Sequence, residues 1–385
     1  MRIIVSRDVL HHRYGACVGS VDNGLSYAVG LRALGHEVYL MADVEPERCV
    51  DAGSRPVAFS EWDGRRRFES VARAYGIWPR CCLIYDRGAE THGMPFDRAV
   101  EAARSADLLL VIGGRMRTPE ILEGVRRRAY VDQNPAKTQV YYAEHGADYG
   151  FDAFDGFFTL GLNIGSADCE IPTGGLDWRP LLSPVVLDAW PVEPERRRGP
   201  FTTISTWEGK HTFRFRGRHS GEKADEWRRY IDLPCRTRQE MGIALPIDGA
   251  HARDAELLLA HGWRLYDPGR LRDRSDYRTF IARSRAEFSV ANGRYVAFNT
   301  GWFSERSARY LASGRPVLVQ STGFERHLPT GLGLLSFVSI DDALSGIEEI
   351  NTNYAAHCRA AREIAEEHFA SDRVLGGLLE RLALV

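Results

Sequence analysis

Short apolar segments alternate with amphipathic stretches through the first half of the chain, and this alternation limits the folds it can adopt. The apolar runs occupy 2–6, 36–41, 81–85, 108–112, 129–132 and 156–160. Apolar residues recur at helical spacing between several of these runs, as at 25–34 and 96–105. Strands that alternate with helices are typical of βαβ units around a parallel sheet. The first half therefore predicts an α/β domain with a Rossmann-like sheet.

The segment 183–200 interrupts this pattern, because it is rich in proline and charge and has little periodicity. After it the alternation restarts and predicts strands at 201–206, 287–290 and 316–320, helices at 222–231, near 237–245, after Ser275, at 304–312 and over 340–369, and an amphipathic turn at 374–384. A chain of 385 residues also suits two domains better than one. We therefore predict an N-terminal domain of residues 1–188, joined by 370–385, and a C-terminal domain of residues 189–369.

The composition argues against several classes of partner. The 50 lysines and arginines nearly balance the 52 aspartates and glutamates, so no broad basic field attracts nucleic acid. No apolar run approaches the ~18 residues that a membrane span needs, and the first residues do not resemble a signal peptide. The scattered cysteines suggest reduced thiols. We expect a cytoplasmic protein, a monomer or homodimer, without a nucleic-acid partner or a membrane span.

The most informative motif lies in residues 299–319. A loop containing Gly301 leads into a predicted helix, which ends at Gly314, and Pro316 opens the next strand. The first turn of this helix contains Ser304, Glu305, Arg306 and Ser307. Free amide groups and the positive end of the helix dipole attract phosphate, so such a turn can bind a nucleoside diphosphate. An ordinary capped helix with an acid in its first turn is the alternative interpretation.

The order of helix, glycine, proline and strand in 305–319 resembles the C-terminal domain of nucleotide-sugar glycosyltransferases of the GT-B fold, the glycosyl transferases group 1 type. The resemblance continues through 321–325, 328–335 and 341–343, and 30–38 is similar to the first helix-to-strand turn of that fold. It implies an α/β chain of the GT-B class. In that class two Rossmann-like domains face each other across a cleft, and a C-terminal helix crosses back to the N-terminal domain.

The resemblance also implies roles for individual residues. In that family the helix N-terminus meets the pyrophosphate and a glutamate binds the nucleotide ribose, which makes Glu305 the residue for ribose or sugar hydroxyls and a catalytic candidate. The implied phosphate contacts are Gly301, Ser304, Arg306 and Ser307. Retaining members usually carry an earlier glutamate as well, and the matching position here is Ala297. The resemblance therefore leaves open whether the reaction retains or inverts stereochemistry.

Further donor-site candidates follow the first predicted strand of the second domain. Trp207 comes directly after this strand, and Arg218 and Lys223 precede the next predicted helix. GT-B enzymes often place an arginine and a lysine here, where the two cations neutralise the departing diphosphate. The lysines of the whole chain are only Lys137, Lys210 and Lys223. We therefore expect Trp207, Arg218 and Lys223 at the donor site, with a solvated basic hairpin as the alternative.

An inverting transfer needs a base for the acceptor hydroxyl, and a histidine or aspartate in the cleft is the usual group. The candidates near predicted strand ends are His11, His12, His92 and Asp132. Ligands gather at such strand ends in open α/β sheets. We take His92 and Asp132 as the leading catalytic candidates, although position alone selects many residues and a structural role is the commoner one for any of them.

Together these features predict a glycosyltransferase that moves a sugar from a UDP-, GDP- or dTDP-sugar to a small-molecule or glycan acceptor. No Asp-x-Asp motif and no cluster with metal-ligand spacing occurs in the sequence, so we expect a reaction without metal or other cofactor. Three alternatives stay open: a GT-B nucleotide-sugar epimerase, a phosphorylase, and a non-catalytic nucleotide-sugar-binding protein. A nicotinamide-dependent dehydrogenase is less favoured, because the glycines at 15–24 do not follow the dinucleotide-binding spacing.

Overall fold

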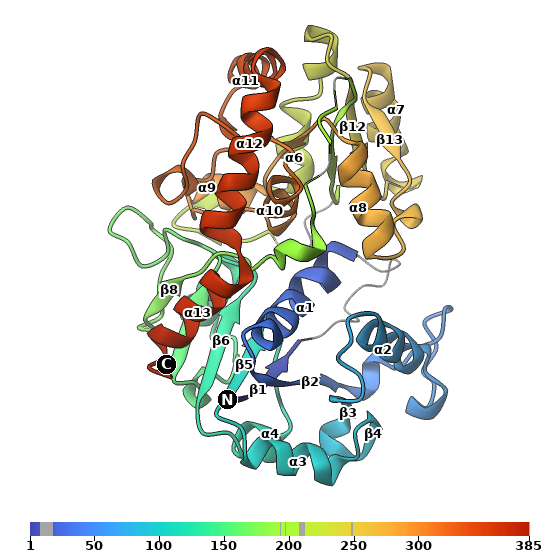
Figure 1. The fold of residues 1–385 in the computed structure, drawn as a ribbon, viewed down its shortest axis with the longest axis vertical. Coiled ribbons are helices and arrows are strands. Elements are labelled where there is room, and N and C mark those ends of the chain that lie inside the picture. Colours follow the sequence, from blue (N-terminus) through green and yellow to red (C-terminus); the bar gives the residue numbers. More distant parts are fainter. Residues whose placement is uncertain (8–17, 193, 197, 208–211, 248, 385) are drawn as a thin grey trace.

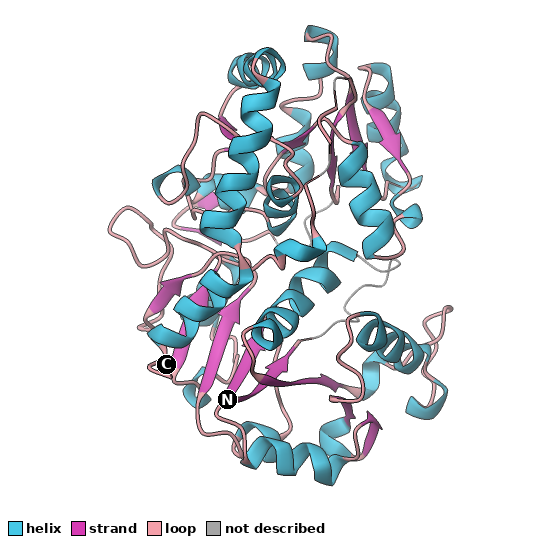
Figure 2. Cartoon of the chain, viewed as in Figure 1, coloured by secondary structure: helices cyan, strands magenta, loops and turns pink. Residues whose placement is uncertain are grey.

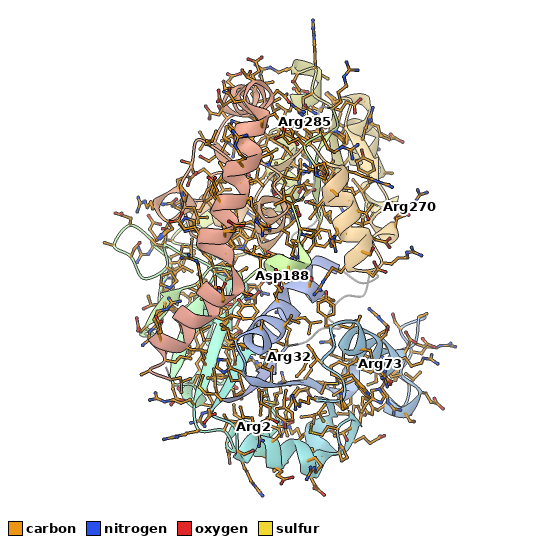
Figure 3. The ribbon with its side chains drawn as sticks, viewed as in Figure 1. Arg2, Arg32, Arg73, Asp188, Arg270 and Arg285 are labelled. Carbon is orange, nitrogen blue, oxygen red and sulfur yellow. The ribbon has the colours of Figure 1, made fainter. Side chains whose placement is uncertain are left out.

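The computed structural model describes residues 1–7, 18–192, 194–196, 198–207, 212–247 and 249–384. The chain folds into two α/β halves, one above the other in Figure 1, and helices flank the strands in both (Figure 2). His11, His12 and Lys210 lie outside the described residues. A short helical turn at Leu187–Ala189 connects the halves, and Figure 3 labels Asp188 on it, between the two sheets.

The N-terminal half contains an eight-stranded sheet in the order β4-β3-β2-β1-β5-β6-β7-β8. Its strands are β1 (Arg2–Ser6), β2 (Glu37–Val44), β3 (Cys81–Tyr85), β4 (Glu90–Gly93), β5 (Leu108–Ile112), β6 (Arg128–Asp132), β7 (Gly156–Thr159) and β8 (Trp178–Pro180). Its helices are α1 (Val18–Ala33), α2 (Asp63–Ala74), α3 (Phe96–Arg104), α4 (Pro119–Leu122) and α5 (Lys137–His145). Every pairing is parallel except that of β3 with β4. The six strands predicted from apolar runs are confirmed.

The C-terminal half contains a six-stranded parallel sheet in the order β13-β12-β9-β14-β15-β16. Its strands are β9 (Phe201–Ile204), β12 (Met241–Ala244), β13 (Arg264–Tyr266), β14 (Ala286–Ser289), β15 (Val317–Gln320) and β16 (Leu334–Phe337), and a hairpin of β10 (Arg214–Phe215) and β11 (Arg218–His219) stands apart. Its helices are α6 (Lys223–Arg228), α7 (Ala252–Ala260), α8 (Arg274–Arg283), α9 (Gly293–Ala297), α10 (Glu305–Ala312), α11 (Ile340–Thr352) and α12 (Tyr354–Ile364).

The helix predicted near 237–245 is wrong, because Met241–Ala244 form strand β12. This strand pairs with β9 on one side and β13 on the other, and all four of its residues are buried. Gly242 has no side chain where the Tyr266 ring packs, since a Cβ there would lie 2.5 Å from the ring. A four-residue apolar run is too short for its periodicity to separate a buried strand from a helix, and the sheet decides.

The last helix, α13 (Ser371–Arg381), returns to the N-terminal half and packs beside α1, as Figure 1 shows. Leu375, Leu378 and Leu379 are buried, and they share one apolar core with residues of α1 and of the N-terminal sheet. The predicted arrangement of two Rossmann-like domains with a helix that crosses back is therefore confirmed. The exact boundaries at residues 188 and 370 stay a prediction. None of the described helices has both the length and the apolar composition needed to cross a bilayer.

Candidate functional site

The C-terminal sheet reverses its strand order at β9, and the start of α10 lies over this point. From β9 the sheet continues to β12 and β13 on one side and to β14, β15 and β16 on the other. In open α/β sheets, ligands bind outside the carboxyl ends of the strands at such a reversal. Arg306, in the first turn of α10, donates hydrogen bonds to Ile204 O at the end of β9 (2.7 Å) and to Ser289 Oγ at the end of β14 (2.6 Å). This position makes the α10 start the candidate site.

Arg306 anchors the helix start to the sheet. Its Nε also donates to Glu287 Oε1 at 2.5 Å, and Glu287 is fully buried on β14. Burial is the largest influence and alone would lower the pKa of Arg306, but Glu287, Tyr277 and Glu305 together outweigh burial and raise that pKa. The guanidinium is thus occupied by three protein acceptors. A phosphate contact through Arg306, as predicted from the sequence, would have to use the two N–H groups that remain of its five or exchange one of these bonds.

The other residues of the predicted phosphate turn are mostly buried. Ser304 caps α10, since its Oγ accepts a hydrogen bond from the Arg306 N–H at 3.2 Å. Ser307 Oγ has no partner among the described residues and faces a small cavity beneath the helix, which Ser289 and Gln320 also line. Gly301 faces the N-terminal half instead, because a Cβ there would lie 2.8 Å from the backbone nitrogen of Asn163.

Glu305 is the first residue of α10 and is half-buried. No described side chain donates a hydrogen bond to its carboxylate, yet its charge acts on both halves of the molecule. It raises the pKa of Lys223, which burial lowers, and it adds to the burial-driven rise in the pKa of Tyr27 on α1. The charge of Glu305 therefore acts on Lys223 of the C-terminal half and on Tyr27 of the N-terminal half.

Lys223 is buried at the start of α6 and forms no ion pair or hydrogen bond with any described residue. Burial, together with the nearby Arg306 and Arg294, lowers the pKa of Lys223 to about 7, against the opposing effect of Glu305 and Glu287. A buried ammonium without a partner is costly, and an arriving anion would remove that cost. Of the cations predicted at the donor site, Lys223 has the environment of an anion-binding group.

Arg294 belongs to the same group, although its sequence context did not indicate it. It lies in the first turn of α9, where its guanidinium donates to Tyr295 Oη at 2.9 Å and its Nε is buried without an acceptor among the described residues. A Cβ on Gly293 would lie 2.8 Å from Ser220 O, so only glycine allows the loop before α6 to approach α9 this closely. This contact brings Lys223 and Arg294 together.

Trp207 and Arg218 have structural partners, and Arg218 also donates to Ala297 O at the end of α9. Trp207 is buried in the core of the C-terminal half, and its indole nitrogen donates to Asp254 Oδ2 at 2.9 Å. Arg218 is exposed on β11, where its guanidinium pairs with Glu170 Oε2 at 3.3 Å and covers the Phe298 ring. Packing and an interdomain ion pair occupy these residues, and their role at the donor site stays a prediction.

The two predicted bases also have structural partners. His92 lies on β4, the edge strand at the bottom of Figure 1, between Glu69 (3.2 Å) and Arg65 (3.3 Å) of α2. Asp132 lies at the end of β6 and is fully buried. Its carboxylate accepts hydrogen bonds from Thr138, Gln139, Thr159 and the Asn134 N–H at 2.6–2.9 Å. His92 therefore lies on an edge strand, whereas Asp132 lies at the end of a central strand but has its oxygens occupied.

Ion pairs and hydrogen bonds hold the two halves around the site. Asp22 on α1 accepts from Arg309 Nε of α10 at 2.6 Å and from Arg274 Nε of α8 at 2.7 Å, and both Asp22 and Arg309 are buried. Asn163, in the loop after β7, donates its backbone N–H to Thr300 O at 3.0 Å and its side chain to Asn299 O at 2.8 Å. Within the described part of the chain, no three histidine, cysteine, aspartate or glutamate side chains converge as metal ligands.

Comparison with known proteins identifies the fold. No protein-family model and no curated protein matches the sequence. An alpha-glucosyltransferase solved with UDP and DNA superposes with a TM-score of 0.62 at 10% identity, covering 99% of this chain and 98% of the other. HepE of Anabaena, solved with UDP and glucose, gives 0.56 at 11% identity over 100% of both chains. A putative UDP-N-acetylglucosamine 2-epimerase from Listeria monocytogenes gives 0.50 at 12% identity, over 99% and 96%. The predicted GT-B fold is confirmed.

Proposed function

We propose that this GT-B chain is a glycosyltransferase, which binds a nucleoside-diphosphate sugar at the start of α10 and transfers the sugar to an acceptor in the interdomain cleft. The observation that carries the proposal is that Lys223, a buried cation without a partner among the described residues, is close enough to feel the charge of Glu305 at a helix N-terminus. Glu305 opens α10, and the next residue, Arg306, bonds to the ends of β9 and β14 at the strand-order reversal, which supports a ligand at this place. Solved chains of this fold hold UDP, which supports a nucleotide as the ligand.

The two charges suit opposite ends of a nucleoside diphosphate. Lys223 and Arg294 can bind the diphosphate oxygens, and the amide groups at the start of α10 add positive potential. Glu305 can accept hydrogen bonds from the ribose or sugar hydroxyls. During transfer the bond from the sugar C1 to the phosphate oxygen breaks and a bond to the acceptor oxygen forms. Negative charge then develops on the diphosphate, and cations already in place stabilise it most in the transition state.

The proposal does not depend on His92 or Asp132. The acceptor hydroxyl loses its proton as the new bond forms, and the departing phosphate can take it if no side chain does. Lys223 and Arg294 together supply the charge neutralisation that a reaction without metal requires. The proposal is consistent with transfer that retains the stereochemistry at the sugar C1 and with transfer that inverts it.

A thermal-shift experiment with UDP, GDP and dTDP tests the donor site. A ligand at 100 times its Kd stabilises a protein by about 2.7 kcal/mol, so at least one nucleotide should raise the melting temperature measurably. Glu305→Ala should remove most of this shift, because hydrogen bonds to a charged group contribute about 1.5–3 kcal/mol. Asp372→Asn is the matched control, since Asp372 is an exposed acid in the first turn of α13. An undiminished shift in Glu305→Ala would refute the role of Glu305.

An epimerase is the second candidate, because the Listeria protein named as one has the same fold. An epimerase inverts a sugar carbon of the donor without an acceptor, whereas a transferase needs the acceptor to release the nucleoside diphosphate. The protein is incubated with sugar derivatives of the nucleotide that stabilises it, and the sugars are then analysed by chromatography. The products distinguish an epimerase from a transferase. An epimerised sugar in the absence of any acceptor would replace the transferase proposal.

A further inference from the structure

A second pocket lies between the two domains beside α13, the helix that returns to the N-terminal half (Figure 1). Leu162 and residues 180–182 line it from the N-terminal half, His327 lines it from the C-terminal half, and α13 with the turn before it forms the remaining wall. Its volume is about 270 Å³, near the lower end of the ~300–1,000 Å³ typical of small-molecule sites. None of the described residues lines both this pocket and the cavity beneath α10. We call it the α13 pocket.

Two arginines of α13 line the α13 pocket. Arg373 lies in the first turn of the helix and is exposed. Arg381 ends the helix, and it donates Nε to Gly377 O at 2.9 Å and Nη1 to Pro180 O at 2.7 Å. These bonds hold the Arg381 guanidinium in place and leave further N–H groups for a ligand. The pocket therefore has positive charge on the same wall at two levels of one helix.

Two histidines complete the polar lining. His327 Nε2 lies 2.8 Å from Asn163 Oδ1, which fixes the ring at the contact between the domains. His368 Nε2 lies 3.9 Å from Glu367 Oε2, but Glu367 itself does not line the pocket. Among the described residues that form the lining, none is acidic. An anion in the α13 pocket would thus meet nitrogen donors without a competing carboxylate on the pocket wall.

The space in the α13 pocket depends on Gly377. Glycine weakens the interior of a helix relative to alanine. The structure gives no backbone reason for it here, because Gly377 is helical and a Cβ there would meet nothing within 4 Å. Since Gly377 lines the pocket, a longer side chain would extend into it. Its neighbour Gly376 is equally unconstrained but does not line the pocket, so the two glycines form a matched pair.

We infer that the α13 pocket binds a small molecule in which an anionic group, a phosphate or a carboxylate, is joined to an apolar body. Arg373 binds the anion, and Leu162, Leu181 and Leu182 contact the apolar body. Charge-assisted hydrogen bonds supply affinity for the anion, and burial of the apolar body adds to it. This ligand goes beyond the proposed glycosyltransferase function, because no residue of the α13 pocket belongs to the donor site.

Calorimetric titration of four probes tests the inference. Phenyl phosphate and benzoate each join an anion to an apolar ring, whereas inorganic phosphate has no ring and benzyl alcohol has no charge. We expect the better of the first two to bind at least tenfold more tightly than inorganic phosphate and benzyl alcohol. Its identity shows whether the pocket prefers a phosphate or a carboxylate. Equal affinities for all four probes, or no binding of phenyl phosphate and benzoate, would overturn the inference.

Variants locate the better probe in the α13 pocket. Gly377→Leu should weaken its binding at least tenfold by filling the pocket, and Gly376→Leu, the matched control, should leave its affinity within twofold. Arg373→Gln should also weaken it about tenfold, because the variant loses the charge that binds the anion. Arg270→Gln is the control for charge, since Arg270 is exposed on the C-terminal half (Figure 3). Wild-type affinity in Gly377→Leu or in Arg373→Gln would overturn the inference.

A competition experiment separates this inference from the proposed function. The better probe should bind the wild-type protein alongside UDP, because the two sites share no lining residue. Displacement of the probe by UDP would place the probe in the donor site and overturn the inference. Failure of UDP, GDP and dTDP to bind would contradict the donor site alone, since the probe titrations and the glycine variants need no nucleotide.

Discussion

At the scale of single residues, Lys223 has the clearest functional chemistry. A guanidinium stays charged when buried, whereas a lysine amine can lose its proton, and burial brings the pKa of Lys223 to about 7. The charged groups that act on it are Arg306, Arg294, Glu305 and Glu287. Near neutral pH the amine is thus charged in only part of the unliganded molecules, and a bound diphosphate would restore its proton.

Nucleotide binding should therefore take up a proton above pH 7. The free amine is mostly neutral there, and the anionic ligand raises its pKa, so affinity falls as pH rises from about 7. Below pH 7 the amine is already charged and this dependence disappears. Calorimetry in buffers of different ionisation enthalpy measures the number of protons taken up on binding. We choose pH 8 because the nucleotide phosphate, with a pKa near 6, is then fully ionised and takes up no proton itself.

Two variants complete the measurement. Lys223→Arg keeps the charge and should bind nucleotide without proton uptake, because arginine does not titrate in this range. Lys223→Met should bind about tenfold more weakly or worse and also without uptake. Proton uptake that persists in Lys223→Arg would show that another group takes the proton.

At the scale of elements, the approach of α9 to the loop before α6 decides which cations share a site. Gly293 opens α9, and Gly221 stands opposite it with a φ of +68°, a conformation that favours glycine. Their backbones touch, since a Cβ on Gly293 would lie 3.0 Å from Gly221 Cα. Neither glycine contacts a ligand in our proposal, yet both set the positions of Lys223 and Arg294.

Gly293→Ala should weaken nucleotide binding about tenfold while the protein stays folded. The added methyl group meets a backbone oxygen, which cannot rotate away, so α6 and α9 must separate at a cost of about 1–3 kcal/mol. Nucleotide affinity and melting temperature are measured on the same variant. Weaker binding at a nearly unchanged melting temperature indicates displaced cations, whereas a large fall in melting temperature indicates lost stability. Gly376→Ala on α13 is the control, because a Cβ there has nothing within 4 Å. Wild-type affinity in Gly293→Ala would show that this contact does not position the cations.

At the scale of the whole molecule, Asp22 connects three helices from both domains. Burial alone would raise the pKa of Asp22, but the guanidinium groups of Arg309 and Arg274 outweigh burial and lower it. Tyr75 donates a further hydrogen bond at 2.9 Å. Because Arg309 lies on α10, the same contact that joins the domains also directs the start of α10 toward the cleft.

Asp22→Asn should destabilise the protein by about 3–5 kcal/mol, since it leaves a buried guanidinium without its carboxylate. Equilibrium unfolding in denaturant measures the loss, with Asp372→Asn as the exposed control. The pKa of Asp22 is lowered in the folded state, so its contribution is present above the ordinary aspartate pKa of 3.8 and disappears as pH falls below it. A difference between variant and wild type that persisted at lower pH would point to packing rather than charge.

The amino-acid sequence by itself determined the local elements and the site's central helix. Six of the eight strands of the first sheet, the start of α10 and its acid Glu305 follow from apolar spacing and from glycine and proline at element ends, which are properties of neighbouring residues. The scarcity of lysine also singled out Lys223. Sequence periodicity could not separate helix from strand at 241–244, because four apolar residues satisfy both patterns.

Only the tertiary structure decided which of these residues share a site. Asp22 and Arg309 meet between the two domains from distant parts of the chain, and spacing along a sequence does not record such contacts. The fold also gives several predicted residues other surroundings. Trp207 and Asp132 form hydrogen bonds within the protein, and His92 lies on a remote edge strand. Charge and burial act through space, so a cation becomes a binding group only when the fold removes its water and supplies no acid.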